Sequence, residues 1–392
     1  MSSKNTRPAI VLTGATGILG SALLAESILR GYRPIAIMRD ATLEQARARI
    51  RAVLSVYGLR HAAEDVSIAK GDVQRPWLGM DPRTAAGVLG CARAVIHCAA
   101  STSFDPRNSH SVWEANVGGA SNVIDFLSLR RVPLYHVSTA YVAGARSGVA
   151  YETELDDRHG FTNAYERSKW FAEAAVRASF DRGDIRGAIF RPGIIVGSSS
   201  DGSISDFQNV YGFFRLIHLA QTRLANRAGL VRIEGEASTP CNFVPVDWTA
   251  KALWTIIEND GPSNQTYHLT DASGITLGDM LGWVNAHLDD AGLRFELVKE
   301  LTGAVHVVEQ MARSAFQYYR PYAFRQPRFN MSNTLRATQA TLPLPPVQED
   351  TFDRLFHFAR SRHWKGALSN VHTTATYGDL TVKPLKPEAL PA

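Results

Sequence analysis

Two groups of residues in this chain have types and spacings that could do chemistry together. The first is a glycine-spaced turn, with Gly14, Gly17 and Gly20 directly behind a short apolar run. Bare glycine backbone at a strand-to-helix junction lets a pyrophosphate approach the N-terminus of the helix. The second is Tyr165 with Lys169, whose spacing puts a phenol and an ammonium on one helical face. Together they predict a dinucleotide cofactor and a proton donor.

Tyr165 needs help to act as an acid or base near neutral pH, because a free phenol titrates at about pH 10. Lys169 could supply that help, since its charge favours the phenolate and its ammonium could also reach the nicotinamide ribose. Two hydroxyls, Ser138 and Thr139, follow a predicted strand at the edge where open parallel sheets keep their active sites. We assign Thr139 to the substrate carbonyl oxygen, with Ser138 as the neighbour that could act instead. A surface Tyr/Lys ladder and a hydroxyl that only caps the strand are the structural alternatives.

The end of the predicted second strand bears on the choice between NAD and NADP. A carboxylate at this point accepts a hydrogen bond from the ribose 2′-hydroxyl of NAD, whereas a guanidinium suits the 2′-phosphate of NADP. Here Arg39 comes one residue before Asp40, the nearest acid. We therefore predict NADP, while Asp40 leaves NAD open.

Further cofactor contacts are expected where the other strands end. Asp72 could meet the adenine amino group, although a turn aspartate explains it equally well. Ala99 and Ala100 are small enough to let the cofactor lie flat, and Asn116 either supports a proton relay or is an ordinary helix residue. His97 is expected to be a packed core histidine. The predicted cofactor-binding set is Gly14, Thr16, Gly17, Ile18, Leu19, Gly20, Arg39, Asp72, Val73, Ala99, Ala100, Asn116, Tyr165, Lys169, Pro192, Gly193, Ile194 and Ile195.

The elements that must position these residues are visible as an alternation over the first two hundred residues. Short β-branched runs alternate with longer amphipathic stretches, which predicts an α/β fold with a Rossmann-type, doubly wound parallel sheet. Strands are expected at residues 9–13, 34–38, 66–70, 94–98, 134–137 and 187–190. Helices are expected at 18–30, 43–57, 82–89, 112–131 and 164–182.

The alternation weakens after residue 200, which predicts a second, smaller part. We expect residues 1–200 to form an NADP-binding domain and 201–365 a C-terminal substrate-binding domain. A strand at 266–270, within residues 241–270, is expected to return to the first sheet, so the two parts interleave. Residues 366–392 show little periodicity and predict a loosely ordered tail.

Composition excludes several classes of protein. The chain has 392 residues and a net charge of +5, with Lys and Arg spread along it, so no nucleic-acid footprint is indicated. This mild excess of positive charge leaves an anionic substrate or an acidic carrier protein as a possible partner. Three cysteines without a CxxC pair suit a reducing cytoplasm, and twelve histidines without an HExxH pattern give a metal site no support. The N-terminus lacks a signal-peptide pattern, residues 8–25 do not read as a transmembrane segment, and no GxSxG elbow is present.

With these residues in view, the chain resembles the extended short-chain dehydrogenase/reductase superfamily over residues 8–270. Within it the chain is most similar to the thioester reductase and fatty acyl-CoA reductase branch. The matching segments are residues 14–20, 71–73, 97–104, 137–142, 163–169 and 191–197. The resemblance implies NADPH-dependent reduction of an acyl thioester, held on coenzyme A or a carrier-protein arm, to an aldehyde or alcohol. Thr139 and Tyr165 would stabilise the oxyanion, and Tyr165 would supply the proton.

Two other classes keep the cofactor and change the function. One is a hydroxysteroid-type or ketone dehydrogenase, or a nucleotide-sugar epimerase or dehydratase. The other is a non-catalytic NADP-binding sensor, against which the presence of both Tyr165 and Lys169 counts. Aromatics after residue 200 favour an apolar pocket over the polar, arginine-bearing pocket that a sugar nucleotide needs. Those between residues 317 and 329 either pack as a lid edge or core corner or line the substrate.

Overall fold

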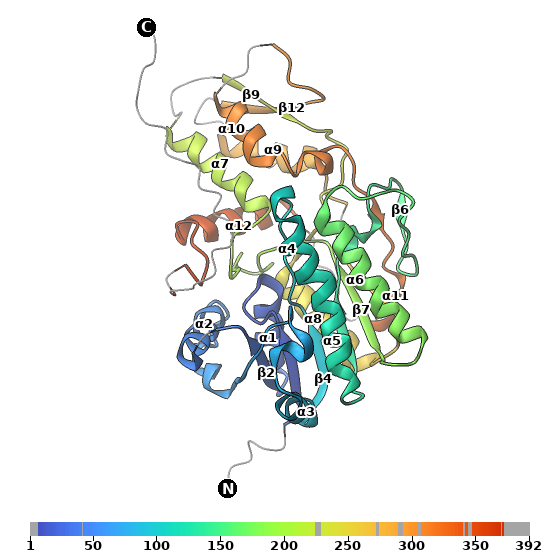
Figure 1. Ribbon diagram of the computed structural model, residues 1–392. Coiled ribbons are helices and arrows are strands. Elements are labelled where there is room, and N and C mark those ends of the chain that lie inside the picture. Colours follow the sequence, from blue (N-terminus) through green and yellow to red (C-terminus); the bar gives the residue numbers. More distant parts are fainter. Residues whose placement is uncertain are drawn as a thin grey trace.

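The computed structural model describes residues 7–40, 42–223, 229–271, 274–288, 293–303, 307–339, 342–343, 347–369 and 371. Of the tail predicted over residues 366–392, only residues 366–369 and 371 are among the described residues. In Figure 1 the central sheet and its helices lie below, and a second group of helices with a two-stranded ribbon lies above them.

A parallel sheet forms the centre of the described structure, and its strands follow the order β3-β2-β1-β4-β5-β7-β11. The chain starts in the middle at β1, moves outward to β3, and then crosses back to β4 beside β1. That reversal is a topological switch point, where open sheets of this kind bind their ligands. The strands are β1 (Ala9–Thr13), β2 (Arg33–Met38), β3 (Ser67–Lys70), β4 (Ala92–His97), β5 (Leu134–Val137), β7 (Gly187–Pro192) and β11 (Thr266–Leu269).

The predicted fold class is confirmed, and each of the six strands expected in the first two hundred residues is present within two residues of its predicted ends. The strand expected at 266–270 also joins the sheet, as β11 beside β7. These strands were recognisable because most of their residues are buried, which gives short, almost continuous apolar runs.

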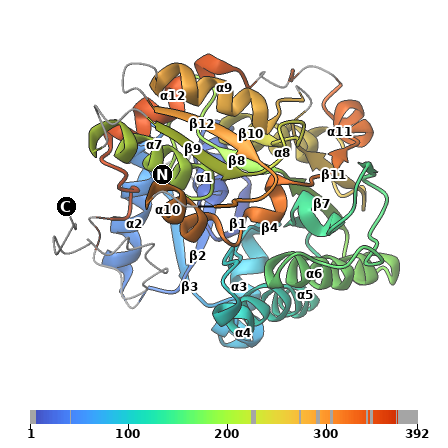
Figure 2. The same cartoon turned by 90° about the horizontal axis from the view of Figure 1, so that it is seen from above.

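Helices cover both faces of the sheet, and Figure 2 shows α5 and α6 on one side and α1 and α8 on the other. One buried cluster unites side chains of α1, α2 and α8, and another unites those of α3, α5 and α6. The helices are α1 (Ile18–Leu29), α2 (Leu43–Ser55), α3 (Pro82–Cys91), α4 (Ser109–Trp113), α5 (Gly119–Ser128), α6 (Ala164–Asp181) and α8 (Val246–Asn259). The single helix predicted over 112–131 is instead α4, one wide π turn at Glu114–Gly118, and α5.

The second group of elements has an aromatic core of its own. Phe214, Trp283, Phe352 and Phe356 pack edge to face or tilted on one another, with ring centroids 5.4–6.2 Å apart. Its helices are α7 (Val210–Arg223), α9 (Leu277–Leu288), α10 (Val307–Phe316) and α12 (Glu349–Ser361), with the parallel strands β9 (Gly229–Glu234) and β12 (Leu293–Val298).

Two short strand pairs and one helix connect this group with the central sheet. Strand β8 (Ile194–Val196) pairs with β10 (Phe243–Pro245), and β6 (Val149–Ala150) pairs with β13 (Arg328–Phe329). Helix α11 (Ser332–Ala337) packs on β11. Segments from late in the chain therefore lie against the central sheet. The division into domains at residue 200 stays a prediction.

Candidate active site

The glycine turn after β1 is built so closely that side chains would not fit. Gly14 has a φ of +72°, and a Cβ there would lie 2.6 Å from the backbone nitrogen of Ala99. A Cβ on Gly20 would lie 1.9 Å from the carbonyl oxygen of Gly14. Gly17 is the N-cap of α1, and its N–H donates to the Gly14 carbonyl at 3.0 Å. The start of α1 therefore presents bare backbone at the carboxyl edge of β1, which is the geometry an anion needs.

A charged cluster lies at the end of β2, beside this turn. The Arg39 side chain is exposed to solvent. Asp40 is engaged by Arg49, whose Nη1 lies 3.1 Å from both carboxylate oxygens. The Nη2 of Arg49 donates to Oγ1 of Thr16 at 2.9 Å, so Arg49 ties the glycine turn to the end of β2. Arg49 is not among the residues predicted from the sequence, although its place on the helix after the second strand puts a basic side chain near Asp40.

Asp72 and Val73 lie in the turn after β3. The Asp72 carboxylate accepts from the N–H of Gln74 at 3.0 Å, and its own N–H donates to the carbonyl of Leu78 at 2.7 Å. The carbonyl of Val73 accepts from the amide of Asn122 at 2.8 Å. These bonds give Asp72 the turn role that its sequence position left open, and contact with adenine stays a prediction.

The loop after β4 lies between the glycine turn and α6. Thr13 Oγ1 accepts from the N–H groups of Cys98 and Ala99, both at 3.2 Å, and pairs with Nδ1 of His97 at 2.8 Å. The His97 ring is buried, which confirms its prediction as a core histidine. Ala99 and Ala100 follow in this loop, with Ala99 directly against Gly14.

Buried histidines make the folded protein sensitive to acid. Burial lowers the pKa of His97 and of His268 to about 3, and it lowers the pKa of His136 well below its ordinary value. Histidines of an unfolded chain titrate at about pH 6.5, so below that pH only the unfolded state binds these protons. The stabilisation is thus present above about pH 6.5 and is lost as the pH falls toward 3. Between about pH 6.5 and pH 5 we expect the free energy of unfolding to fall by about 2 kcal/mol per histidine.

Urea unfolding at these two pH values measures this loss. Glu152 and Glu166 act in the opposite direction, because burial raises the pKa of both carboxyls. The histidine share is therefore isolated with variants: His97→Asn should flatten the pH dependence, and His61→Gln, at an exposed site, should leave it unchanged. Equal pH dependence in the wild type and in the His97 variant would show that this buried ring does not contribute.

Asn116 lies in the π turn and is fully hydrogen-bonded. Its Oδ1 accepts from the N–H of Ser101 at 2.8 Å, and its Nδ2 donates to the Ser101 carbonyl at 3.0 Å and to Oγ of Ser168 at 2.8 Å. It therefore ties the loop after β4 to α6, one residue before Lys169. This is a positioning role, and its predicted parts in a proton relay and in cofactor binding stay untested.

Helix α6 begins at a cap that sets the place of Tyr165. The Asn163 side chain accepts from the N–H of Glu166 at 3.0 Å, which starts the helix one residue before the phenol. Burial raises the pKa of Tyr165 to about 12, and a side-chain hydrogen bond with Thr139 opposes that rise. Tyr165 and Thr139 are thus brought together as predicted, and Tyr165 is a neutral phenol near pH 7.

Lys169 is buried one turn further along α6. Its Nζ donates to the carbonyl of Val137 at 2.7 Å, and burial lowers its pKa to about 8. The sequence predicts that Lys169 favours the phenolate of Tyr165, whereas the pKa of Tyr165 is raised. The reason is that the Lys169 ammonium points to the Val137 carbonyl at the end of β5, while burial has the largest effect on the pKa of Tyr165 and raises it.

The Ser138 side chain is directed toward Glu173. Its hydroxyl donates to Glu173 at 2.7 Å, and Glu173 forms a buried ion pair with Arg191 at 2.7 Å. Burial alone would raise the pKa of Glu173, but the positive charge of Arg191 lowers it to about 2. The Ser138 hydroxyl thus serves this ion pair, and its assignment as an alternative ligand of the carbonyl stays a prediction.

An aromatic cluster lies beside Tyr165. The Phe104 ring, from the loop after β4, lies 5.6 Å from Tyr165, 5.1 Å from Tyr319 and 5.8 Å from Tyr322. The Tyr322 hydroxyl donates to Glu166 and accepts from the amide of Asn163 at 2.8 Å. Part of the 317–329 segment thus packs, through Phe104, beside Tyr165. Phe104 was missed as a site residue, although it ends one of the segments that carry the resemblance.

The last predicted cofactor residues lie where β7 leads into β8. A Cβ on Gly193 would lie 2.5 Å from the carbonyl oxygen of Asn242, and the N–H of Ile194 donates to that oxygen at 3.0 Å. Ile194 and Ile195 are both partly exposed, and Pro192 is buried at the end of β7. Their contact with a cofactor stays a prediction.

The sheet order, the glycine turn at the switch point and Tyr165 with Lys169 define an NAD(P)-binding reductase of the extended short-chain dehydrogenase/reductase fold. Residues 12–253 match the NAD-binding family described as Male sterility protein, and the chain belongs to this family. Among the described residues, none of the helices combines the length and apolarity that crossing a membrane requires.

Three relatives illustrate what the chain is similar to. The isonitrile lipopeptide synthase of Streptomyces coeruleorubidus is 27% identical over 285 residues, which are 71% of this chain and 18% of that protein. The terminal R domain of the myxalamid PKS-NRPS pathway superposes with a TM-score of 0.76 at 23% identity, covering 92% of each chain. A thiolation-reductase di-domain of an archaeal non-ribosomal peptide synthetase gives 0.71 at 18% identity, covering 91% of this chain and 76% of that one. The chain spans less than a fifth of the first curated relative, and the two structures establish the fold.

Proposed function

We propose that this protein reduces acyl thioesters with NADPH, releasing an aldehyde or an alcohol. The acyl group would be held on coenzyme A or on the arm of a carrier protein. The observation that carries the proposal is the arrangement at the carboxyl edge of the sheet. Tyr165 lies in the first turn of α6 and keeps its proton near pH 7, and Lys169 of the same helix donates to the Val137 carbonyl, two residues before Thr139. The resemblance to a thiolation-reductase di-domain supports a carrier-bound substrate.

The residues around the glycine turn fit a dinucleotide. Gly14 and Gly20 leave space that a Cβ would fill, and Gly17 offers the uncapped start of α1. These glycines would hold the pyrophosphate, Arg39 the 2′-phosphate and Lys169 the nicotinamide ribose. When bound, the cofactor supplies a hydride to the thioester carbonyl carbon.

The chain's own residues handle the oxygen and its proton. Thr139 and Tyr165 donate hydrogen bonds to the carbonyl oxygen, and these bonds strengthen as negative charge develops there. Because the pKa of Tyr165 is raised to about 12, the phenol still carries its proton at neutral pH and can give it to the oxyanion. Collapse of the resulting hemithioacetal breaks the carbon–sulfur bond, which releases the thiol and the aldehyde.

We infer NADP as the preferred cofactor from the two arginines at the end of β2. Asp40 is already engaged through both of its oxygens by Arg49, so it is a poor acceptor for a ribose 2′-hydroxyl. Arg39 is exposed and carries a charge that suits a 2′-phosphate.

Replacing Arg39 tests this preference. Arg39→Ala should weaken NADPH binding by about ten- to a hundredfold, since one charge-assisted contact to the phosphate is lost, and should weaken NADH binding less than about twofold. Fluorescence titration of both cofactors measures this, with Arg51→Ala on α2 as a matched control. Equal losses for NADPH and NADH would remove Arg39 from the recognition of a 2′-phosphate.

The aromatic cluster favours an apolar acyl group over a sugar nucleotide. Phe104 lies between Tyr165 and Tyr319, so apolar ring faces adjoin the phenol that would hold the carbonyl. A ketone or hydroxysteroid-type substrate would use the same ring faces and the same phenol, and it is the second candidate.

We also place the protein in the cytoplasm, because its cysteines Cys91, Cys98 and Cys241 are free thiols, which suits a reducing compartment.

A substrate panel separates these functions. NADPH absorbance is followed with acyl-CoAs of increasing chain length, acyl-pantetheines, ketosteroids and UDP-sugars, and free thiol is measured in the same samples. We expect NADPH loss together with thiol release from the thioesters. Turnover of a ketone without thiol release at any acyl chain length would replace the proposal with the second candidate.

A further inference from the structure

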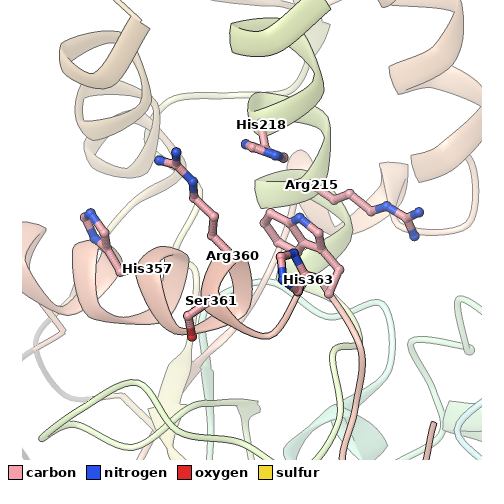
Figure 3. Close-up of a pocket in the computed structure, with 7 residues that line it drawn as sticks. Arg215, His218, His357, Arg360, Ser361 and His363 are labelled. Carbon is pink, nitrogen blue, oxygen red and sulfur yellow. The ribbon is translucent and has the colours of Figure 1, made fainter. Parts of the chain in front are cut away.

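A pocket lies between α7 and α12. These elements carry neither the glycine turn nor Tyr165. It has a volume of about 630 Å³, and Figure 3 shows its seven lining residues as sticks, six of them labelled. Arg215 and His218 come from α7, and the other residues come from the end of α12 and the turn after it. The lining residues are Arg215, His218, His357, Arg360, Ser361, His363 and Trp364.

The charge of this pocket has one sign. Every ionisable side chain among the described lining residues is an arginine or a histidine. Arg215 and Arg360 are both exposed. In Figure 3 the guanidinium of Arg360 lies near His218, while Arg215 extends toward the other side. A ligand here would therefore meet positive charge at two separate points.

The turn after α12 has a left-handed backbone conformation and forms one wall of the pocket. His363 and Trp364 have φ values of +50° and +59°, a left-handed conformation that costs a non-glycine residue about 1–2 kcal/mol. The N–H of Trp364 donates to the carbonyl of Ala359 at 3.0 Å, which folds the chain back on the helix. The Trp364 ring then lies 5.8 Å from His218 and 6.0 Å from Phe356. The hydrogen bond from Trp364 to Ala359 is the C-terminal cap of α12, and the cap places the Trp364 ring at the wall of the pocket.

These features together define the chemistry of the ligand. Guanidinium groups match the oxygens of a phosphate, and imidazoles and the hydroxyl of Ser361 add further donors. The partly exposed Trp364 ring offers a face on which a planar base could stack. The volume falls within the range of about 300–1,000 Å³ that small-molecule sites occupy. We propose that the pocket between α7 and α12 binds a phosphate-bearing anion through Arg215 and Arg360.

The test measures binding alone, so its outcome is independent of the proposed reductase activity. Full-length protein is first saturated with NADP⁺, which occupies the cofactor site, and is then titrated by calorimetry at low ionic strength. The probes are inorganic phosphate and adenosine 3′,5′-bisphosphate. Binding of either probe supports the proposal if it weakens at least tenfold in the Arg215→Ala/Arg360→Ala double variant. A bisphosphate that binds at least tenfold more tightly than phosphate identifies a nucleotide, and equal affinities identify the phosphate group alone.

Arg362→Ala is the matched control, since Arg362 is exposed on the same turn but does not line the pocket. We expect its affinity for both probes to stay within twofold of the wild type. Absence of binding to the NADP⁺-saturated protein would overturn the proposal. Equal affinities in the wild type, the double variant and the control would overturn it as well, because the anion would then bind elsewhere.

Discussion

Replacing Tyr165 with phenylalanine should lower kcat by at least about a hundredfold and leave the affinity for NADPH within about twofold. The variant keeps the ring, whose centroid lies 5.6 Å from that of Phe104, and it removes the hydroxyl that would give its proton to the substrate oxygen. We therefore expect kcat to fall, while folding and the affinity for NADPH stay unchanged. Steady-state kinetics on a thioester and a fluorescence titration with NADPH measure the two effects separately.

Tyr151→Phe provides the control for this result, because the Tyr151 side chain is exposed. Its kcat should equal that of the wild type. A Tyr165→Phe variant with a near-normal kcat would remove Tyr165 from the mechanism. A variant that also lost NADPH affinity would mean that the hydroxyl acts mainly in holding the cofactor site together.

Replacing Gly20 with alanine should have the largest effect on the structure itself. The new Cβ would lie 1.9 Å from the carbonyl oxygen of Gly14 and 2.7 Å from its carbonyl carbon. Both contacts are with backbone, so α1 must move away from the turn, and overpacking of this kind costs about 1–3 kcal/mol. We expect lower stability in urea unfolding and a loss of NADPH affinity of at least about tenfold.

Gly87→Ala is the matched substitution for this test. Gly87 lies inside α3, and a Cβ there would meet no atom within 4 Å. Because alanine is a better helix former than glycine, this variant should be more stable by about 0.5–1 kcal/mol. If Gly20→Ala kept wild-type stability and NADPH affinity, the close approach of Gly20 to Gly14 would not be what shapes the site.

Much of the fold could be predicted from the sequence because it depends on local patterns. Most strands of the central sheet are buried and appear as short apolar runs, and the glycine spacing marks the first turn. The prediction of one continuous helix over residues 112–131 was less accurate. It contains a π turn at Asn116, whose side chain binds Ser101 and Ser168, and such distant partners leave no periodic signal.

The site residues that the sequence did not reveal depend on contacts across the fold. Ser138 and Thr139 are adjacent, and successive side chains of an extended chain point to opposite sides, so the choice between them depends on register. In the structure the Ser138 hydroxyl donates to Glu173, which favours Thr139 for the substrate carbonyl. Arg49 is recognised only when α2 is placed beside Asp40, and Phe104 only when Tyr319 of the C-terminal segment packs on it.

The central claim is that this protein delivers a hydride to the carbonyl carbon of an acyl thioester. The most direct measurement uses NADPH that carries deuterium at the transferred position, with acyl-CoA and acyl-pantetheine as substrates, and follows the products by mass spectrometry and a thiol assay. We predict deuterium on the carbon that was bonded to sulfur, together with one free thiol for each acyl group reduced. Intact thioester, with deuterium found only in the alcohol formed from an added ketone, would contradict the account.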